Sequence, residues 1–145
     1  MRTRTNYFWN IIFSLFFAGL ILWGYSYLIQ IHRIPGGVSL TDFFLMALAI
    51  FRLVRLFTYD LITKFIRDWL HEARPNTFFG TLSELINCPW CTGLWFSAVV
   101  VFAYFVTPLA WGIILILGLA GLASFFQLLS NLVGWHAEGK KREVQ

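Results

Sequence analysis

The side chains of this chain that are best suited to chemistry are its only two cysteines, Cys88 and Cys91. They lie three residues apart at the start of a long apolar run. Pro89 between them suits the first turn of a helix, where its missing N–H needs no partner, and Asn87 or Cys88 would then cap that turn. Both thiols would face a helix N-terminus, whose unpaired N–H groups and positive dipole favour the thiolate. The spacing therefore predicts a thiol pair more reactive than ordinary cysteine, without identifying an activity.

Three roles for this thiol pair are open. Its C-P-W-C form is similar to the C-P-[aromatic]-C of glutaredoxins, and C-x-x-C at a helix end of a membrane bundle resembles quinone-linked disulfide oxidases. The chain lacks the βαβ pattern of the glutaredoxins, and it lacks the second cysteine pair of the disulfide oxidases. Metal binding needs two subunits to share the ion, because two sulfur atoms and His71 leave a tetrahedral site incomplete. The third role is a structural or partner contact by small, soft side chains. We expect no cofactor.

A second candidate site consists of charged and amide side chains inside predicted spanning helices. Arg52 and Arg55 lie three residues apart, on adjoining parts of one helix face. A guanidinium at that depth is costly unless it has a partner. Measured from the outer turn at about 1.5 Å per residue, Arg55 and Gln127 both lie roughly 22 to 24 Å deep. The last helix can therefore offer the Gln127 and Asn131 amides to Arg55, with Asp60 one turn below as a carboxylate partner.

Two interpretations of these intramembrane residues are open. In the first, buried polar groups fix the register of neighbouring helices. In the second, the arginines bind an anionic lipid head group or the carboxylate of a partner protein. Arg67 is one of the cations expected on the inner side of the membrane. Trp95 is interpreted as an interfacial anchor and contact surface.

Composition indicates what kind of protein holds these sites. Of its 145 residues, 59% are hydrophobic and only 12% are charged, whereas soluble domains have about 25% charged residues. Its 16 phenylalanines suit a lipid-facing surface better than a soluble core of this size. The chain is thus predicted to be a membrane protein, and membrane topology explains its net charge of +4 without nucleic-acid binding.

The apolar segments predict an all-α fold, a single domain over residues 1–145 that forms an integral membrane four-helix bundle. Predominantly apolar stretches of about 17–25 residues are long enough to cross a hydrocarbon core of roughly 30 Å. Between the second and third crossings, charged residues alternate with apolar ones, as in an amphipathic helix that lies in the interface. The expected spanning helices are residues 8–31, 40–58, 89–106 and 111–133, and the interfacial helix is residues 59–72.

Capping signals mark two of the helix starts. Ser39 followed by Asp42 is a capping box with Asp in place of Glu, and it predicts a helix that runs without a break over residues 40–72. Thr81 and Glu84 form a second capping box, which predicts a short helix just before the cysteine pair.

The distribution of basic residues predicts the orientation. With the N-terminus inside the cell, eight cations lie on the inner side and one, Arg33, on the outer side, a strong positive-inside bias. Both termini and the thiol pair are then cytoplasmic. The first helix has no convincing cleavage site and is expected to stay as an anchor. The inner cations are Arg2, Arg4, Lys64, Arg67, Arg74, Lys140, Lys141 and Arg142.

Several motifs occur in a specific order. They are F-R-L-x-R-L at residues 51–56, Y-D-x-I at residues 59–62, Arg67, and C-P-W-C-x-G-x-W at residues 88–95. This set resembles a bacterial family of small membrane proteins catalogued as domain of unknown function 1360, over about residues 45–106. The resemblance implies a bacterial or phage source and sporulation-associated relatives. It implies no catalytic assignment, because the family has none.

These observations predict a small assembly or interaction subunit of a membrane complex, without catalysis of its own, in the bacterial cytoplasmic membrane. Its expected partners are the lipid bilayer, including anionic head groups, and other membrane protein subunits or a second copy of the chain. The alternative function is a membrane-bound thiol–disulfide redox protein. The residues expected to matter are Arg52, Arg55, Asp60, Arg67, Gln127, Asn131, Cys88, Cys91 and Trp95.

Overall fold

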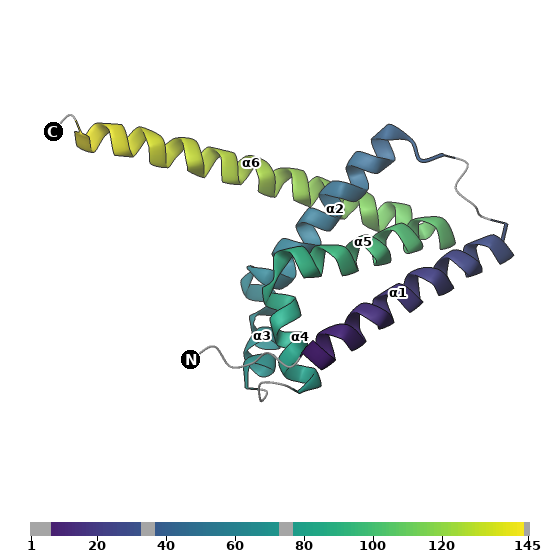
Figure 1. The fold of residues 1–145 in the computed structure, drawn as a ribbon. Helices are drawn as coiled ribbons and strands as arrows, with labels where there is room; N and C mark the ends of the chain where they lie inside the picture. The colour runs from purple at the N-terminus through teal and green to yellow at the C-terminus, as the bar shows by residue number, and fades with distance from the viewer. Residues whose placement is uncertain (1–6, 33–36, 73–76, 144–145) are drawn as a thin grey trace.

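The computed structural model describes residues 7–32, 37–72 and 77–143, with side chains from Phe8 to Trp135 within these ranges. The described residues form helices and no strand, which confirms the predicted all-α class (Figure 1). In chain order the elements are α1 (Tyr7–Gln30), α2 (Leu40–Thr58), the 3-10 turn η1 (Leu61–Thr63), α3 (Lys64–His71), α4 (Phe78–Asn87), α5 (Pro89–Val106) and α6 (Leu109–Glu143).

Three helices are long and apolar enough to cross a membrane: α1 from Phe8, α5 over its whole length, and α6 as far as Trp135. In their most apolar stretches only 11%, 11% and 17% of the residues are buried inside the protein. Most of their apolar side chains therefore face outward, as on a surface in contact with lipid. α2, expected as the second crossing, is not in this group, because it carries Asp42, Arg52 and Arg55 within 19 residues.

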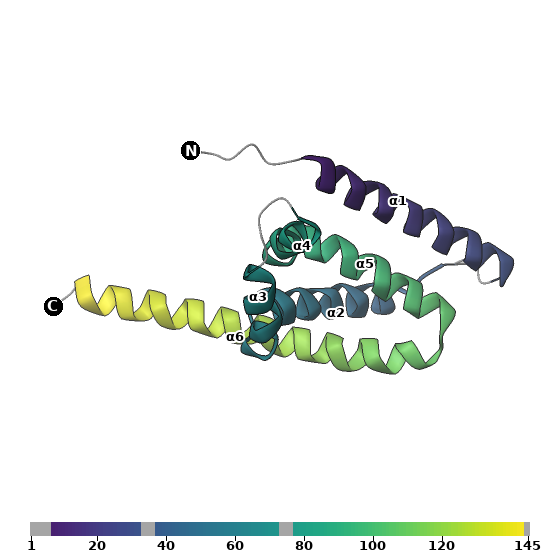
Figure 2. The ribbon, with the colours of Figure 1, turned by 90° about the horizontal axis from the view of Figure 1, so that it is seen from below.

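The packed core lies where α2 meets α5 and α6. α2 makes its most extensive contacts with α6 and its next most extensive with α5, and both views show it alongside these two helices (Figures 1 and 2). The buried core side chains are Met46 and Ala49 of α2, Val100 of α5, and Ala110 and Ile114 of α6. The core is thus built by three of the four helices that the sequence predicts to cross the membrane.

α1 lies at the edge of the molecule, as Figure 2 shows, and packs on α5 through aromatic rings. The ring centroids of Phe17 and Trp95 are 4.9 Å apart, and those of Trp23 and Phe102 are 6.1 Å apart. Because the contacting residues advance in the same direction along both helices, α1 runs parallel to α5. The N-terminal ends of these two helices therefore lie at the same end of the molecule.

Two glycines of α6 allow α2 to approach closely. A Cβ atom at Gly121 would lie 2.3 Å from the carbonyl oxygen of Leu48 and 3.4 Å from the Cβ of Arg52, and one at Gly118 would lie 3.1 Å from the carbonyl oxygen of Leu45. Only hydrogen fits at the first of these positions. Small residues at a crossing let the backbones of membrane helices come close, so the α2–α6 contact depends most on Gly121.

The predicted unbroken helix over residues 40–72 is wrong. Tyr59 and Asp60 end α2 by donating their N–H groups to the same carbonyl oxygen, that of Arg55, at 2.9 and 3.1 Å. The chain then continues as the separate elements η1 and α3, in place of a single interfacial helix over residues 59–72. The spacing of the charged residues favours a continuous helix, but the contacts that Asp60 makes interrupt that helix.

The other helix bounds agree more closely. α1 and α5 match the predicted residues 8–31 and 89–106 within one residue. α6 exceeds the predicted residues 111–133, and its helical backbone includes the basic residues 140–142. α4 begins one turn earlier than its predicted cap at Thr81, because the hydroxyl of Thr77 accepts the Gly80 N–H at 3.2 Å.

Candidate functional site

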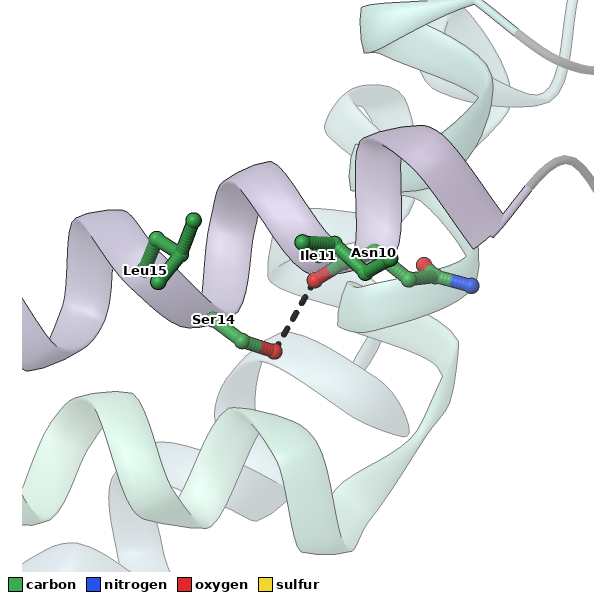
Figure 3. A pocket seen from close by; sticks show the side chains of 4 residues that line it. All are labelled: Asn10, Ile11, Ser14 and Leu15. Atoms are coloured by element: carbon green, nitrogen blue, oxygen red, sulfur yellow. Dashed lines mark hydrogen bonds between the residues drawn. The ribbon is translucent and has the colours of Figure 1, made fainter.

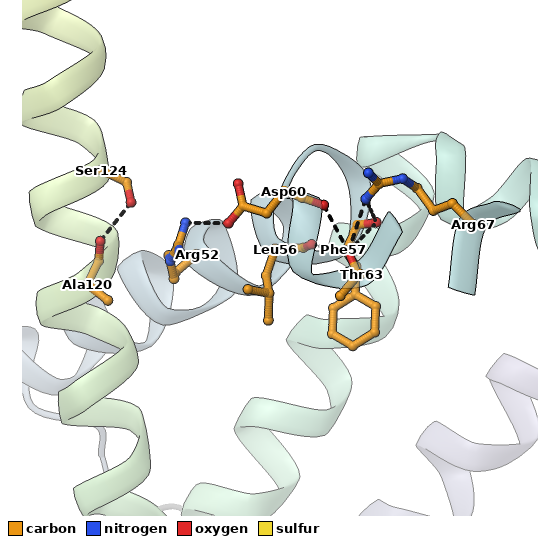
Figure 4. Close-up of polar contacts among 8 residues, drawn as sticks. All are labelled: Arg52, Leu56, Phe57, Asp60, Thr63, Arg67, Ala120 and Ser124. Atoms are coloured by element: carbon orange, nitrogen blue, oxygen red, sulfur yellow. Dashed lines mark hydrogen bonds and ion pairs between the residues drawn. The ribbon is translucent and has the colours of Figure 1, made fainter. Parts of the chain in front are cut away.

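The candidate site is a polar cluster at the C-terminal end of α2, where the chain turns into η1 and α3 (Figure 4). Arg52 Nη1 lies 2.8 Å from Asp60 Oδ2, and each side chain is 26% exposed. Asp60 has an extended backbone, with φ −73° and ψ 150°. Its carboxylate returns toward α2 from just beyond the helix end, and the ion pair thus holds the turn against the helix that precedes it.

Arg67 and Thr63 complete the cluster from the α3 side. Arg67 Nη1 donates to the Phe57 carbonyl oxygen at 2.9 Å and to Thr63 Oγ1 at 3.0 Å. The buried Thr63 hydroxyl donates in turn to the Leu56 carbonyl oxygen. Carbonyl groups of the last helical turn have no partner within their helix and carry the negative end of its dipole. Arg67 supplies both a hydrogen bond and a positive charge there, so it stabilises the C-terminus of α2.

The expected contact between Arg55 and Gln127 is absent. The guanidinium carbon of Arg55 lies 5.6 Å from the centre of the Tyr59 ring, a cation–π distance. Gln127 is exposed, and its Nε2 donates to Asn131 Oδ1 on the same helix at 3.3 Å. Equal depth brings two residues together only where their helices run side by side. α2 and α6 are closest near Gly121 and separate beyond it (Figure 1).

Two threonines connect the end of α2 to the junction that carries the thiols. Thr58 Oγ1 of α2 donates to the Ile86 carbonyl oxygen at 3.3 Å, and Thr92 Oγ1 of α5 donates to the Leu85 carbonyl oxygen at 2.8 Å. Both hydroxyls bind carbonyl groups in the last turn of α4. The arginine cluster and the thiol pair therefore lie at the same end of the molecule.

Cys88 is the N-cap of α5 and Pro89 is in its first turn, as predicted. The sulfur of Cys88 accepts hydrogen bonds from the Cys91 thiol at 2.7 Å and from the Cys91 N–H at 3.3 Å. These two donors lower the pKa of the Cys88 thiol below its ordinary value, against a smaller opposing effect of desolvation. Both cysteines are half-buried, and the geometry is that of a polarised thiol pair.

Trp95, expected as an interfacial anchor, forms a contact between helices. The side chain is half-buried, and its ring lies 4.9 Å from that of Phe17 and 6.1 Å from that of Phe16, centroid to centroid. Aromatic pairs of this kind contribute about 0.5–1.5 kcal/mol beyond the burial of their area. Because α1 packs on α5 largely through rings, Trp95 is one of the residues that hold it there.

A polar contact at the opposite end of α2 was not predicted. Asp42 Oδ2 accepts from the Tyr104 hydroxyl at 2.7 Å, and Asp42 Oδ1 accepts from Trp111 Nε1 at 3.3 Å. One carboxylate thereby joins α2, α5 and α6. The sequence pattern places Asp42 in the capping box of Ser39, whose side chain does cap α2. The overlooked signal was the pair of aromatic donors on either side of the α5–α6 turn.

Other chemistry finds little support in the part of the chain that the structure describes. No group of three or more His, Cys, Asp or Glu side chains there is placed to hold a metal ion. An open pocket on α1 is lined by Asn10, Ile11, Ser14 and Leu15, and the Ser14 hydroxyl is bound to the Asn10 carbonyl oxygen at 2.9 Å (Figure 3). None of these four lining side chains titrates, so the pocket offers no acid or base.

The Arg52–Asp60 pair leads to a prediction about stability. Arg52→Ala and Asp60→Ala should each lower the free energy of unfolding by about 1–3 kcal/mol, because each leaves a partly buried charge without its partner. The double variant should cost less than the sum, by about 0.5–3 kcal/mol. The measurement is SDS titration in mixed micelles, followed by tryptophan fluorescence. Arg55 is the matched control, because its guanidinium group lies over the Tyr59 ring. The effects of Arg55→Ala and Asp60→Ala on the free energy of unfolding should therefore add. Additivity in both pairs would exclude the ion pair.

Comparison with known proteins relates the chain to bacterial proteins. A family model described as protein of unknown function (DUF1360) matches residues 71–130. Sporulation protein YjcA of Bacillus subtilis (strain 168) is 35% identical over 103 residues, and the match covers 59% of this chain and 86% of YjcA. UPF0713 protein YngL of the same strain is 29% identical over 102 residues, and the match covers 62% of this chain and 78% of YngL.

A further relative is much longer than this chain. Peptide transporter CstA of Mycobacterium tuberculosis (strain CDC 1551 / Oshkosh) is 37% identical over 104 residues, and the match covers 68% of this chain and 13% of the transporter. No solved structure matches the chain. Related sequence thus makes up most of some proteins and a small part of another.

Proposed function

The chain belongs to the DUF1360 family of proteins of unknown function, and from this premise we propose that it is an assembly or interaction subunit of a membrane complex. In this proposal it performs no catalysis of its own and binds no nucleic acid. Its partners are the lipid bilayer and other membrane-embedded subunits, which meet it along its apolar helices.

The observation that carries this proposal is the contrast between the interior and the surface. The guanidinium groups of Arg52 and Arg67 are bound within the chain, to Asp60 and to the Phe57 carbonyl oxygen. On the surface, α1, α5 and α6 leave most of their apolar length unburied. The cluster is therefore suited to supporting the fold, and apolar helix surface is what the chain offers to lipid and to partner helices.

The relatives support the same proposal. Related sequence covers 86% of YjcA and 13% of CstA. A unit that occurs both nearly alone and as part of a longer chain is suited to packing against other segments, whether these are separate subunits or the same polypeptide. Neither the transport of peptides nor sporulation is needed for this argument.

We also propose the placement of the chain in the bacterial cytoplasmic membrane, with both termini inside. The N-terminal ends of α1 and α5 and the C-terminal end of α2 share one end of the molecule with the cations Lys64 and Arg67. Cationic loops favour the cytoplasmic side. α2 then crosses beside α6, with the charge of Arg52 neutralised by Asp60. α3 lies in the interface, with the exposed Phe65 toward lipid.

The function is tested by extraction of the tagged full-length chain from native membranes in mild detergent. An assembly subunit should co-elute with the same membrane protein at a constant ratio over repeated preparations, at a mass well above the 16.8 kDa of the single chain. Elution as a single chain in detergents that preserve other membrane complexes would contradict the proposal.

The proposed topology predicts which thiols a membrane-impermeant maleimide can reach. Cys88 and Cys91 should stay unlabelled in intact cells and become labelled once the membrane is opened, because the α4–α5 junction lies on the cytoplasmic side. Ser39→Cys, in a chain with both native cysteines replaced by serine, is the matched control on the outer side and should label in intact cells. Labelling of the native cysteines from outside would reverse the proposed orientation.

A thiol–disulfide redox function is the second candidate, favoured by one observation. The Cys91 thiol donates to the Cys88 sulfur at 2.7 Å, so the two sulfur atoms are close enough to form an internal disulfide, with release of two protons and two electrons to a separate oxidant. Without a second cysteine pair in the chain, that oxidant must be another molecule.

A further inference from the structure

The C-terminal part of α6 runs past the other helices. Figures 1 and 2 both show the second half of α6 extending alone beyond α2, after the close approach at Gly121. From Phe125 to Trp135 every residue is exposed. The surface of this segment is apolar except for a few polar side chains. Its exposed large apolar side chains are Phe125, Phe126, Leu128, Leu129, Leu132, Val133 and Trp135.

Two amides on this segment lie at membrane depth. Trp111 and Trp135 stand 24 residues apart near the ends of the apolar stretch of α6, and tryptophans favour the two membrane interfaces. Their separation is about 36 Å along a helix, so Gln127 and Asn131 lie roughly 6 and 12 Å from the midpoint, inside a hydrocarbon core of roughly 30 Å. Water at that depth cannot satisfy their polar groups.

The two amides satisfy each other only in part. Gln127 Nε2 donates to Asn131 Oδ1 at 3.3 Å. That bond uses one donor group and one acceptor, and leaves Gln127 Oε1 as an acceptor and Asn131 Nδ2 as a donor. No other side chain or backbone group of the described residues bonds to either amide. Each copy of the chain therefore presents one acceptor and one donor, on two side chains that are joined at 3.3 Å and so lie close together.

We propose that two copies of this chain associate through this face of α6, with Asn131 Nδ2 of each copy donating to Gln127 of the partner subunit. In a copy related by a two-fold axis along the membrane normal, the acceptor on Gln127 faces the donor on Asn131 of the other copy. The same contact is repeated the other way round by symmetry, so both bonds form at once. Lipid tails offer no hydrogen bond, and a partner with only donors or only acceptors satisfies half of the site. The inference rests on the proposed function and names a partner for it.

The first experiment is disulfide cross-linking of full-length chains in native membranes, with Cys88 and Cys91 replaced by serine. Gly134→Cys places a thiol one turn below Asn131 on the same face, at a position where a Cβ meets nothing within 4 Å. Leu129→Cys is the matched control, because at about 100° per residue it lies on the opposite face. We expect covalent dimers from Gly134→Cys and few from Leu129→Cys. Equal cross-linking at both positions would contradict the proposed face.

The second experiment measures association of donor- and acceptor-labelled chains in liposomes by energy transfer. Replacing both Gln127 and Asn131 with leucine should raise the dissociation constant about tenfold, the effect of losing interhelical hydrogen bonds worth about 1.4 kcal/mol together. Leu129→Ala should leave it unchanged. An unchanged dissociation constant in the double variant, or a monomeric native chain, would overturn the inference. A native chain that is monomeric yet co-elutes with a different membrane protein would overturn it and leave the proposed function standing.

Discussion

Gly121→Ala should destabilise the protein by about 1–3 kcal/mol, the usual cost of overpacking a filled site. The added methyl group would lie 2.3 Å from the Leu48 carbonyl oxygen. That oxygen belongs to the backbone, so rotation of a side chain cannot relieve the clash, and α2 must move away from α6. The measurement is the free energy of unfolding from SDS titration in mixed micelles, followed by tryptophan fluorescence.

Gly112→Ala is the matched control for this substitution. Gly112 is on the same helix, but a Cβ there meets nothing within 4 Å. Alanine favours a helix interior by roughly 0.8–1 kcal/mol over glycine, so this variant should be as stable as the native protein or more stable. If the two alanine variants are equally stable, α2 and α6 do not approach each other at Gly121.

The same clash has a consequence for the polar cluster. A Cβ at Gly121 would lie 3.4 Å from the Cβ of Arg52, so any shift of α2 also moves the residue that binds Asp60. Gly121→Ala should therefore reduce the coupling energy between Arg52 and Asp60, whereas Gly112→Ala should leave it intact. This comparison tests whether the glycine contact positions the ion pair.

Features that depend on a few neighbouring residues could be predicted from the sequence. The bounds of α1 and α5 follow from uninterrupted apolar runs between polar or proline residues, and the structure has them within one residue. The capping of α5 by Cys88 follows from Pro89 in the next position. Each of these features is decided within one or two helical turns, where spacing and residue type carry enough information.

Features that depend on how helices cross could not be predicted in this way. The residues after Tyr59 have charges at helical spacing, yet α2 ends there, because Asp60 binds Arg52 and Arg67 binds the carbonyl oxygen of Phe57. The position of Gln127, away from α2, follows from the crossing of α2 and α6. That crossing is set by glycines of α6, whose role appears only when the partner helix is known.

The thiol pair decides between the two candidate functions. A redox protein must cycle between dithiol and disulfide, so Cys88→Ser and Cys91→Ser should each abolish function. An assembly subunit needs only the size and position of these side chains. Serine is nearly isosteric with cysteine and is a favoured N-cap residue, so Cys88→Ser retains the cap of α5. We expect both serine variants to retain most of the native complex.

Trp95→Ala should have the larger effect. It removes the ring that packs on Phe16 and Phe17 of α1. Truncation of a fully buried aromatic costs about 3–5 kcal/mol. Because Trp95 is half-buried, we expect Trp95→Ala to cost about 2 kcal/mol. This corresponds to more than a tenfold decrease in the fraction of molecules in which α1 is correctly packed. Trp95→Phe is the matched control, since it keeps an aromatic ring and should recover most of the complex.

Thiol alkylation against pH completes this comparison. Hydrogen bonds from Cys91 lower the pKa of Cys88, so in the Cys91→Ser variant, where the replacement hydroxyl can still donate, Cys88 should alkylate at lower pH than ordinary cysteine. A polarised thiol alone is compatible with assembly, because capping the helix suffices to produce it. The redox function would be established in place of assembly by a joint result: both serine variants inactive, Trp95→Ala mild, and one thiol titrating well below about 7.5. We expect instead that both serine variants are active and that Trp95→Ala loses much of the native complex. The reason is that the chain has one cysteine pair and no second pair to which that pair could pass electrons.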